Sequence, residues 1–107
     1  MRGGYHRPMA SMVLEIDQAH LADVCRRFGV VELALFGSYA HGTPREDSDV
    51  DLLYVLDPAA RLGWGMDDLA RDLESVLGQR VDLVSKRALH PLMAERVLAE
   101  AQVIYAA

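Results

Sequence analysis

Apolar residues follow two different periods along this chain, and these periods divide it into helices and strands. In three stretches they recur at positions i, i+3, i+4 and i+7, the spacing of one face of an α-helix. Elsewhere short apolar runs are bounded by glycine, proline or aspartate, which is typical of strands. The pattern predicts helices over residues 17–28, 66–77 and from Pro91 onward, strands over residues 30–36, 50–56 and 80–84, and an edge strand over residues 103–105.

The same pattern predicts where the helices end and which faces they bury. Asp17 is the expected N-cap of the first helix, and Gly29 and Gly78 are placed to end the first and second helices in the left-handed conformation. Apolar stripes on amphipathic helices usually face the core. We therefore expect the stripe of the last helix to turn inward; it consists of Leu92, Met93, Val97 and Leu98.

The alternation of strands with amphipathic helices indicates the fold class. Such helices pack against a sheet and cover its apolar surface. We therefore expect an α/β (α+β) fold with one small mixed β-sheet flanked by helices. Residues 1–12 show no period and are expected to be a flexible leader, so residues 13–107 would form a single domain.

Composition and charge narrow the class of protein. The chain has 107 residues and a net charge of −5, with 51% hydrophobic and 25% charged residues, as in ordinary globular proteins. This charge argues against stable nucleic-acid binding, which needs a basic face. No apolar run approaches the roughly 20 residues that span a bilayer, and the N-terminal segment lacks a signal peptide's apolar stretch, so a cytoplasmic protein is expected. Cys25 lies in a helical apolar stripe and is expected in the core.

The candidate chemistry lies between Leu33 and Val55. Side chains alternate along a strand, so Asp49 and Asp51 point to the same side. Their mutual repulsion would be removed by a divalent cation such as Mg²⁺. Upstream, the turn at Gly37 offers free backbone N–H groups that suit a phosphate. Taken separately, however, such a pair of aspartates is usually a solvated turn, and a Gly-Ser pair is usually a turn as well.

A third acidic residue stands in the strand expected over residues 80–84. Asp82 lies between Val81 and Leu83, and a buried unpaired carboxylate would be costly there. Two interpretations remain open. Asp82 belongs to a functional site, or it faces water from an edge strand.

Two segments of the chain resemble a known family. GSYAHG, six residues and then DVD (residues 37–51) resemble the signature of the nucleotidyltransferases related to DNA polymerase β, in which GS is followed by a D-x-D pair. Residues 80–101, RVDLVSKRALHPLMAERVLAEA, are similar to the ending of their smallest branch, the minimal nucleotidyltransferases (MNT). The likeness extends from about residue 21 to about residue 105.

The resemblance implies the polymerase β-like nucleotidyltransferase fold and a two-metal site. Asp49 and Asp51 would bind two Mg²⁺ ions, and Asp82 would act as general base or complete the metal site. ATP would be the substrate. The nucleotide-binding candidates are Gly37, Ser38, His41 and Ser48.

His41 departs from the family pattern. Where the family often has arginine after GSxA, this chain has histidine, which is neutral about as often as charged near neutral pH. Arginine is always charged and offers a planar fork to a phosphate. We therefore expect slow catalysis, and we expect His41→Arg to lower the apparent KM for ATP.

The resemblance also implies a partner. MNT proteins are commonly paired with a HEPN ribonuclease toxin, and the implied activity is transfer of AMP from ATP to a tyrosine of that toxin, with release of pyrophosphate. Two alternatives remain: an antitoxin that acts by binding alone, and a small-molecule nucleotidyltransferase with an acceptor site formed by oligomerisation. The sequence leaves open the acceptor, the preferred base and the oligomeric state.

Overall fold

The computed structural model describes residues 16–37, 49–62 and 65–107, so the expected leader lies outside the described residues. All the predicted helices and strands named above are present, and the third strand begins one residue later than expected. None of the described helices is long and apolar enough to cross a membrane. The elements are α1 (Gln18–Phe28), β1 (Val30–Phe36), β2 (Val50–Leu56), α3 (Met66–Leu77), β3 (Val81–Ser85), the short 3-10 helix η3 (Lys86–Ala88), α4 (Pro91–Glu100) and β4 (Gln102–Ala106).

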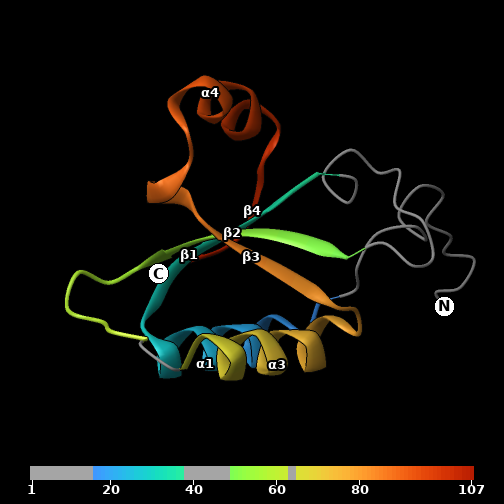
Figure 1. Cartoon of the computed structure of the whole chain (residues 1–107). Coiled ribbons are helices and arrows are strands. Elements are labelled where there is room, and N and C mark those ends of the chain that lie inside the picture. Colours follow the sequence, from blue (N-terminus) through green and yellow to red (C-terminus); the bar gives the residue numbers. More distant parts are fainter. Residues whose placement is uncertain (1–15, 38–48, 63–64) are drawn as a thin grey trace, which may run out of the picture.

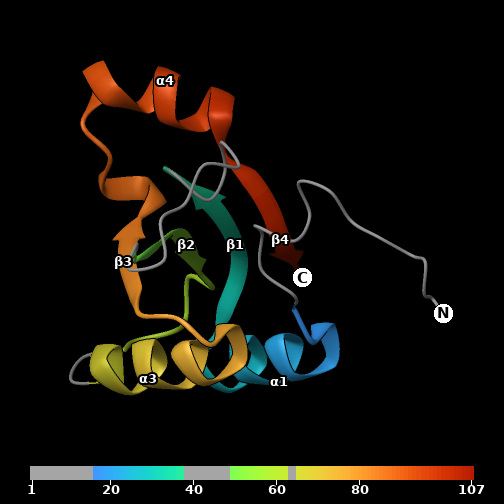
Figure 2. The same cartoon turned by 90° about the vertical axis from the view of Figure 1, so that its right-hand side faces the viewer.

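The four described strands form one mixed sheet in the order β3–β2–β1–β4. Strand β1 runs antiparallel to both β2 and β4, whereas β3 runs parallel to β2. Helices α1 and α3 lie side by side along one face of the sheet, and α4 stands on the opposite side (Figures 1 and 2). The expected α/β (α+β) fold with a small mixed sheet is thereby confirmed.

Capping residues begin and end the helices where the sequence predicts. The Asp17 carboxylate caps α1 by accepting a hydrogen bond of 3.1 Å from the backbone N–H of His20. Gly29 ends α1 with φ of 76°, and Gly78 ends α3 with φ of 74°, both in the left-handed region that favours glycine. These turns direct the chain from each helix back into a strand of the sheet.

The core lies between the sheet and the helix pair α1–α3. Cys25 is fully buried there, as predicted, and burial raises the pKa of its thiol to about 12. The thiol is therefore neutral at physiological pH and acts as a small apolar side chain. The largest fully buried side chains of the described part of the chain are Leu21, Leu33, Leu52, Leu53, Leu69 and Leu73.

The expectation that α4 turns an apolar stripe into the core is wrong. No residue of α4 is buried, and Leu92, Met93 and Leu98 are exposed by 87%, 57% and 42%. The helix itself forms as predicted, because Pro91 occupies its first turn and His90 Nδ1 accepts a hydrogen bond from the Leu92 N–H. The helix α4 stands away from the sheet (Figure 1). Three of the four stripe residues are therefore exposed, and Val97 is half-buried.

Candidate functional site

Three aspartates are carried by one end of the neighbouring strands β2 and β3. Asp49 directly precedes β2, Asp51 is the second residue of β2, and Asp82 is the second residue of β3. The parallel register places Asp51 opposite Asp82. Because their neighbours Leu52 and Leu83 pack in or against the core, Asp51 and Asp82 lie on the other face of the sheet, the side on which α4 stands (Figure 1).

Gly37 brings the end of β1 against this cluster. Phe36, the last residue of β1, pairs with Asp51, and Gly37 then turns the chain with φ of 75°. A Cβ atom at position 37 would overlap Oδ2 of the Asp51 carboxylate. The backbone angle favours glycine, and any side chain here would force the Asp51 carboxylate to shift.

Negative charge is concentrated around Asp51. Burial raises the pKa of the Asp51 carboxyl above its ordinary value, and the charges of Asp82 and Asp49 raise that pKa further. Ionisation of all three groups therefore has an electrostatic cost that a bound cation would remove. The donor set fits Mg²⁺, since this ion prefers hard oxygen ligands and is commonly held by one or two carboxylates together with substrate phosphates.

One carboxylate of the cluster is engaged by a basic side chain. Asp49 Oδ1 lies 3.1 Å from Nη2 of Arg80, which directly precedes β3. In the described part of the chain, no three His, Cys, Asp or Glu side chains are gathered into a set that could hold a metal ion as they stand. As placed here, the three aspartates do not form a ready metal-binding set, and Arg80 neutralises part of their charge.

Hydrogen bonds from two sides fix the backbone that carries Arg80 and Asp82. The Arg80 carbonyl accepts a bond of 2.7 Å from the N–H of Val50, at the start of β2. The N–H of Val81 donates a bond of 3.0 Å to Oε2 of Glu74 on α3. The start of β3 is thus tied both to β2 and to α3, which sets the position of Asp82 relative to Asp51.

The structure describes only some of the predicted site residues. Asp49, Asp51, Asp82 and Gly37 lie at the same end of the sheet, although their roles in metal binding and catalysis remain predictions. Asp82 is exposed and β3 is an edge strand, so its position agrees with both interpretations drawn from the sequence. The other candidates lie outside the described residues; they are Ser38, His41 and Ser48.

The sequence pattern does not single out Arg80, which it predicts only as the first residue of a strand. A signal was available, because Arg80 stands two positions before the candidate Asp82. A basic residue so near a predicted acidic site is worth testing as its counter-charge. Its pairing with Asp49, however, depends on the parallel register of β2 and β3, which the sequence pattern does not specify.

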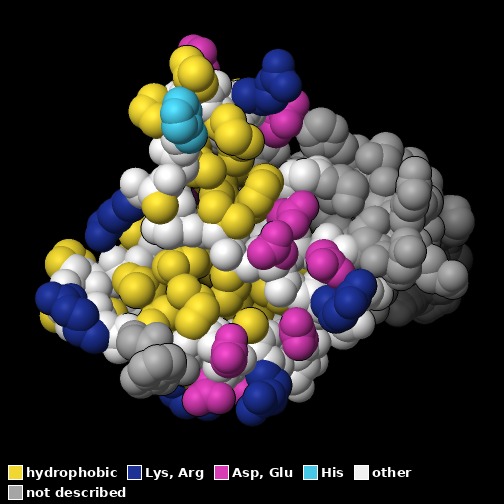
Figure 3. Space-filling view, in the orientation of Figure 1, with side chains coloured by type: hydrophobic (Ala, Val, Ile, Leu, Met, Phe, Trp, Pro, Cys, Tyr) yellow, Lys and Arg dark blue, Asp and Glu magenta, His cyan; other side chains and the backbone are white. Residues whose placement is uncertain are grey.

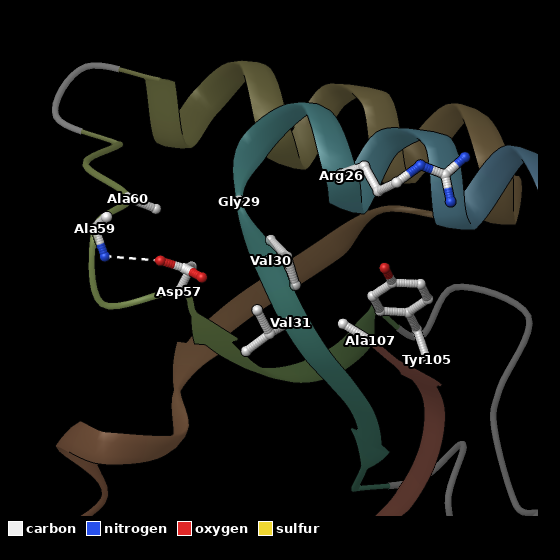
Figure 4. A pocket seen from close by; sticks show the side chains of 9 residues that line it. All are labelled: Arg26, Gly29, Val30, Val31, Asp57, Ala59, Ala60, Tyr105 and Ala107. Carbon is white, nitrogen blue, oxygen red and sulfur yellow. Dashed lines mark hydrogen bonds between the residues drawn. The ribbon is translucent and has the colours of Figure 1, made fainter.

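A pocket of about 520 Å³ lies at the other end of β1 (Figure 4). Arg26 and Tyr105 lie on one side of it and Asp57 on the other, with Val30 and Val31 between them (Figure 4). The Asp57 carboxylate already accepts a hydrogen bond of 2.8 Å from the Ala59 N–H. Asp57 is the only acidic residue among the described residues that line this pocket, and we therefore assign the candidate active site to the opposite end of the sheet.

Comparisons with known proteins identify the family of this chain. The family model "Nucleotidyltransferase domain" matches residues 18–104. The chain is 43% identical over 96 residues to the protein adenylyltransferase MntA of Thermococcus cleftensis, covering 86% of this chain and 96% of that protein.

Solved structures extend the likeness to the fold. A structure described as a minimal nucleotidyltransferase has a TM-score of 0.66 at 43% identity, covering 78% of this chain and 85% of the other. A structure of a toxin–antitoxin with AMP-PNP has a TM-score of 0.61 at 28% identity, covering 86% of this chain and 75% of the other. Because the family model covers most of the chain, this protein belongs to the nucleotidyltransferase family and is a nucleotidyltransferase.

Proposed function

We propose that this nucleotidyltransferase is a cytoplasmic antitoxin that transfers AMP from ATP to a tyrosine of a partner HEPN toxin and releases pyrophosphate. The name of the Thermococcus cleftensis relative, protein adenylyltransferase, supports AMP transfer to a protein. The structural neighbour solved as a toxin–antitoxin with AMP-PNP supports both an adenine nucleotide and a toxin partner. The resemblance of the sequence to the MNT branch supports the same partner class.

The observation that carries the proposal is the placement of the three carboxylates. Asp51 and Asp82 face each other across β2 and β3, and Asp49 stands two residues before Asp51. Nucleotidyl transfer needs neutralisation of phosphate charge and an in-line nucleophile more than it needs covalent help from the protein. One end of the sheet carries three acidic residues beside a close backbone turn, and this placement supports a site for such a transfer.

The reaction assigns a role to each candidate residue. The tyrosine oxygen forms a bond to the α-phosphorus of ATP, while the bond from that phosphorus to the oxygen leading to the β-phosphate breaks and pyrophosphate leaves. Asp82 takes the phenolic proton or completes the metal site. Asp49 and Asp51 would hold Mg²⁺, which supplies charge neutralisation at the triphosphate when bound. The nucleotide phosphates would be bound by Gly37, Ser38, His41 and Ser48.

An exposed apolar surface supports a protein as the acceptor. The exposed large hydrophobic residues among the described positions are all in α4 and β4: Leu92, Met93, Leu98 and Val103. Apolar side chains are visible on α4 and on the surface below it, beside a group of acidic side chains (Figure 3). Apolar patches of this kind commonly mark sites of protein association. A toxin bound to α4 would lie on the side of the sheet that carries Asp51 and Asp82.

The decisive experiment measures the intact mass of the acceptor. A HEPN protein is incubated with ATP, Mg²⁺ and either this protein or its Asp49→Asn/Asp51→Asn variant. The first HEPN protein to test is the one encoded in a neighbouring reading frame. We expect the acceptor to gain the mass of AMP with the natural protein and to gain none with the variant. Peptide mapping should place the added group on a tyrosine.

Other outcomes would select the alternatives. A stable complex without added mass, together with protection of cells by the double variant, would mean that the protein neutralises its toxin by binding alone. Pyrophosphate release with a small-molecule acceptor, in the absence of any protein partner, would indicate a small-molecule nucleotidyltransferase. Either result would contradict AMP transfer to a toxin.

A further inference from the structure

Arg80 combines a backbone held by hydrogen bonds with an exposed side chain. Its carbonyl group is bonded to the N–H of Val50, and the next residue is held by Glu74. Its guanidinium group, by contrast, is exposed, with the side chains of Arg80 and Asp49 exposed by 75% and 47%. Ion pairs exposed to this extent are weak and easily exchanged. The structure thus places an exposed positive charge, held by a weak ion pair, at the edge of the carboxylate cluster.

The pair formed by Arg80 and Asp49 differs from the other ion pairs between described residues. Several basic side chains of the described part of the chain pair with acidic groups that the proposed site does not use: Arg27 with Asp23 and Asp72, Arg71 with Asp68, and Lys86 with Glu32. Arg80 pairs with a proposed metal ligand. A divalent cation bound to Asp49 would repel the guanidinium group, since two positive charges cannot share one carboxylate without cost.

A released guanidinium group beside a bound nucleotide has an obvious partner. Arginine presents a planar fork of N–H donors that matches two oxygens of a phosphate, and such charge-assisted bonds are stronger than those between neutral groups. The triphosphate brings phosphate oxygens to the aspartates that would hold its metal. Arg80 is anchored next to these aspartates by its backbone, so a change in its side-chain torsions alone can redirect the charge.

We propose that Arg80 exchanges partners when the nucleotide binds: it neutralises Asp49 in the metal-free protein and contacts the triphosphate once the metal and the nucleotide are in place. This inference rests on the proposed function, because it takes Asp49 as a metal ligand. Arg80 would therefore weaken binding of the free metal ion and strengthen binding of the metal–nucleotide complex.

Binding measurements with Arg80→Gln test the two effects separately. Mn²⁺ alone is titrated by electron paramagnetic resonance, and an ATP analogue with a methylene bridge between the α- and β-phosphates is titrated by calorimetry in excess Mg²⁺. We expect Arg80→Gln to bind Mn²⁺ about two- to five-fold more tightly and the analogue about five-fold more weakly. Arg80→Lys keeps the charge but not the fork, so it should match the natural protein toward Mn²⁺ and weaken analogue binding by a smaller factor.

Arg71→Gln is the matched control. Arg71 has an exposed side chain on α3 and pairs with Asp68, so this variant removes the same charge from a different surface and should change neither affinity. Tighter binding of Mn²⁺ together with weaker binding of the analogue by Arg80→Gln is the result that an exchange of partners predicts. Unchanged affinities, a shift in only one of them, or weakening of both would overturn the inference, and weakening of both would indicate a purely structural role.

Asp49→Asn separates this inference from the proposed site. If Asp49→Asn leaves Mn²⁺ binding unchanged, the assignment of Asp49 as a metal ligand fails, and the exchange fails with it. If Asp49→Asn weakens Mn²⁺ binding while Arg80→Gln shifts neither affinity, the site stands and the exchange alone is wrong. Circular dichroism of each variant confirms that the fold is retained, as expected for substitutions of exposed residues.

Discussion

At the scale of single residues, Gly37 is the position at which backbone geometry and the candidate chemistry meet. Its φ of 75° disfavours any other residue, and a side chain here would displace the Asp51 carboxylate. Gly78 supplies a natural comparison, since it has a φ of 74° but its Cβ would meet no atom beyond the adjoining chain within 4 Å. Substitution of either glycine would therefore strain the backbone to a similar extent. Only substitution of Gly37 would also disturb Asp51.

Alanine at these two positions should separate stability from activity. Both Gly37→Ala and Gly78→Ala should lower the free energy of unfolding by about 1–2 kcal/mol, the cost of the left-handed conformation for an ordinary residue. Gly37→Ala should also displace the Asp51 carboxylate and reduce AMP transfer about ten-fold or more. Denaturant unfolding and the acceptor-mass assay measure the two effects. Equal transfer by both variants would contradict a role for Gly37 in positioning Asp51.

The sequence predicts some of these residue-level features and misses others, for physical reasons. Strand periodicity is enough to place Asp49 and Asp51 on one side, because alternation follows from the backbone itself. The contact of Gly37 with Asp51 depends on the antiparallel register of β1 and β2, and the pairing of Arg80 with Asp49 depends on the parallel register of β2 and β3. Registers join segments distant in sequence, so a local pattern cannot supply them.

At the scale of elements, α4 shows the limit of hydrophobic periodicity. The helices α1 and α3 end at the glycines that the sequence predicts, and short connections from those glycines return each helix to the sheet, so that its apolar side is buried. The stripe of α4 has the same period, but a period shows only that a helix has an apolar face. Whether another element of the same chain covers that face depends on the path of the backbone, and here it leads α4 away from the sheet (Figure 2).

A polar substitution on α4 should weaken partner binding without harming the fold. Leu92 is exposed by 87%, so Leu92→Gln removes little packing and should change the free energy of unfolding by no more than about 0.5 kcal/mol. If α4 contacts the HEPN toxin, the same change should weaken the complex about ten-fold, the loss expected for a central apolar contact. Calorimetric titration of the toxin measures this affinity.

The control for α4 is Ser75→Gln, which introduces the same side chain at an exposed position of α3, on the other side of the sheet. This variant should bind the toxin as the natural protein does. If Leu92→Gln also retains full affinity, the toxin contacts another surface. The proposal of AMP transfer would still stand in that case.

At the scale of the whole molecule, the acidic cluster links the proposed site to the stability of the fold. The chain carries a net charge of −5, and folding brings Asp51 into a partly buried position near two further carboxylates. The pKa of Asp51 is consequently higher in the folded chain than in the unfolded chain, with burial as the larger cause. A carboxyl group of this kind makes folding less favourable once it is ionised, so the metal-free protein should be more stable without that charge.

The raised pKa of Asp51 determines how the free energy of unfolding changes with pH. Between the ordinary pKa of aspartate, 3.8, and the higher folded value, the unfolded chain holds fewer protons than the folded chain. The free energy of unfolding therefore falls as the pH rises through that window and stays lower above it. Asp51→Asn removes this titration, so in EDTA its Tm should exceed that of the natural protein near neutral pH, and the difference should shrink as the pH falls below the window.

Magnesium should reverse the order of the two proteins. A ligand that binds only the folded state stabilises it by RT ln(1 + [L]/Kd), about 2.7 kcal/mol at a hundred times the Kd, so Mg²⁺ should raise the Tm of the natural protein and leave Asp51→Asn nearly unchanged. Asp67→Asn removes one negative charge from the surface of α3 and should respond to Mg²⁺ as the natural protein does. Calorimetric scans in EDTA and in Mg²⁺ compare all three. An equal magnesium response in Asp51→Asn would show that the ion binds elsewhere, because the carboxylate that the ion is expected to neutralise would then be dispensable.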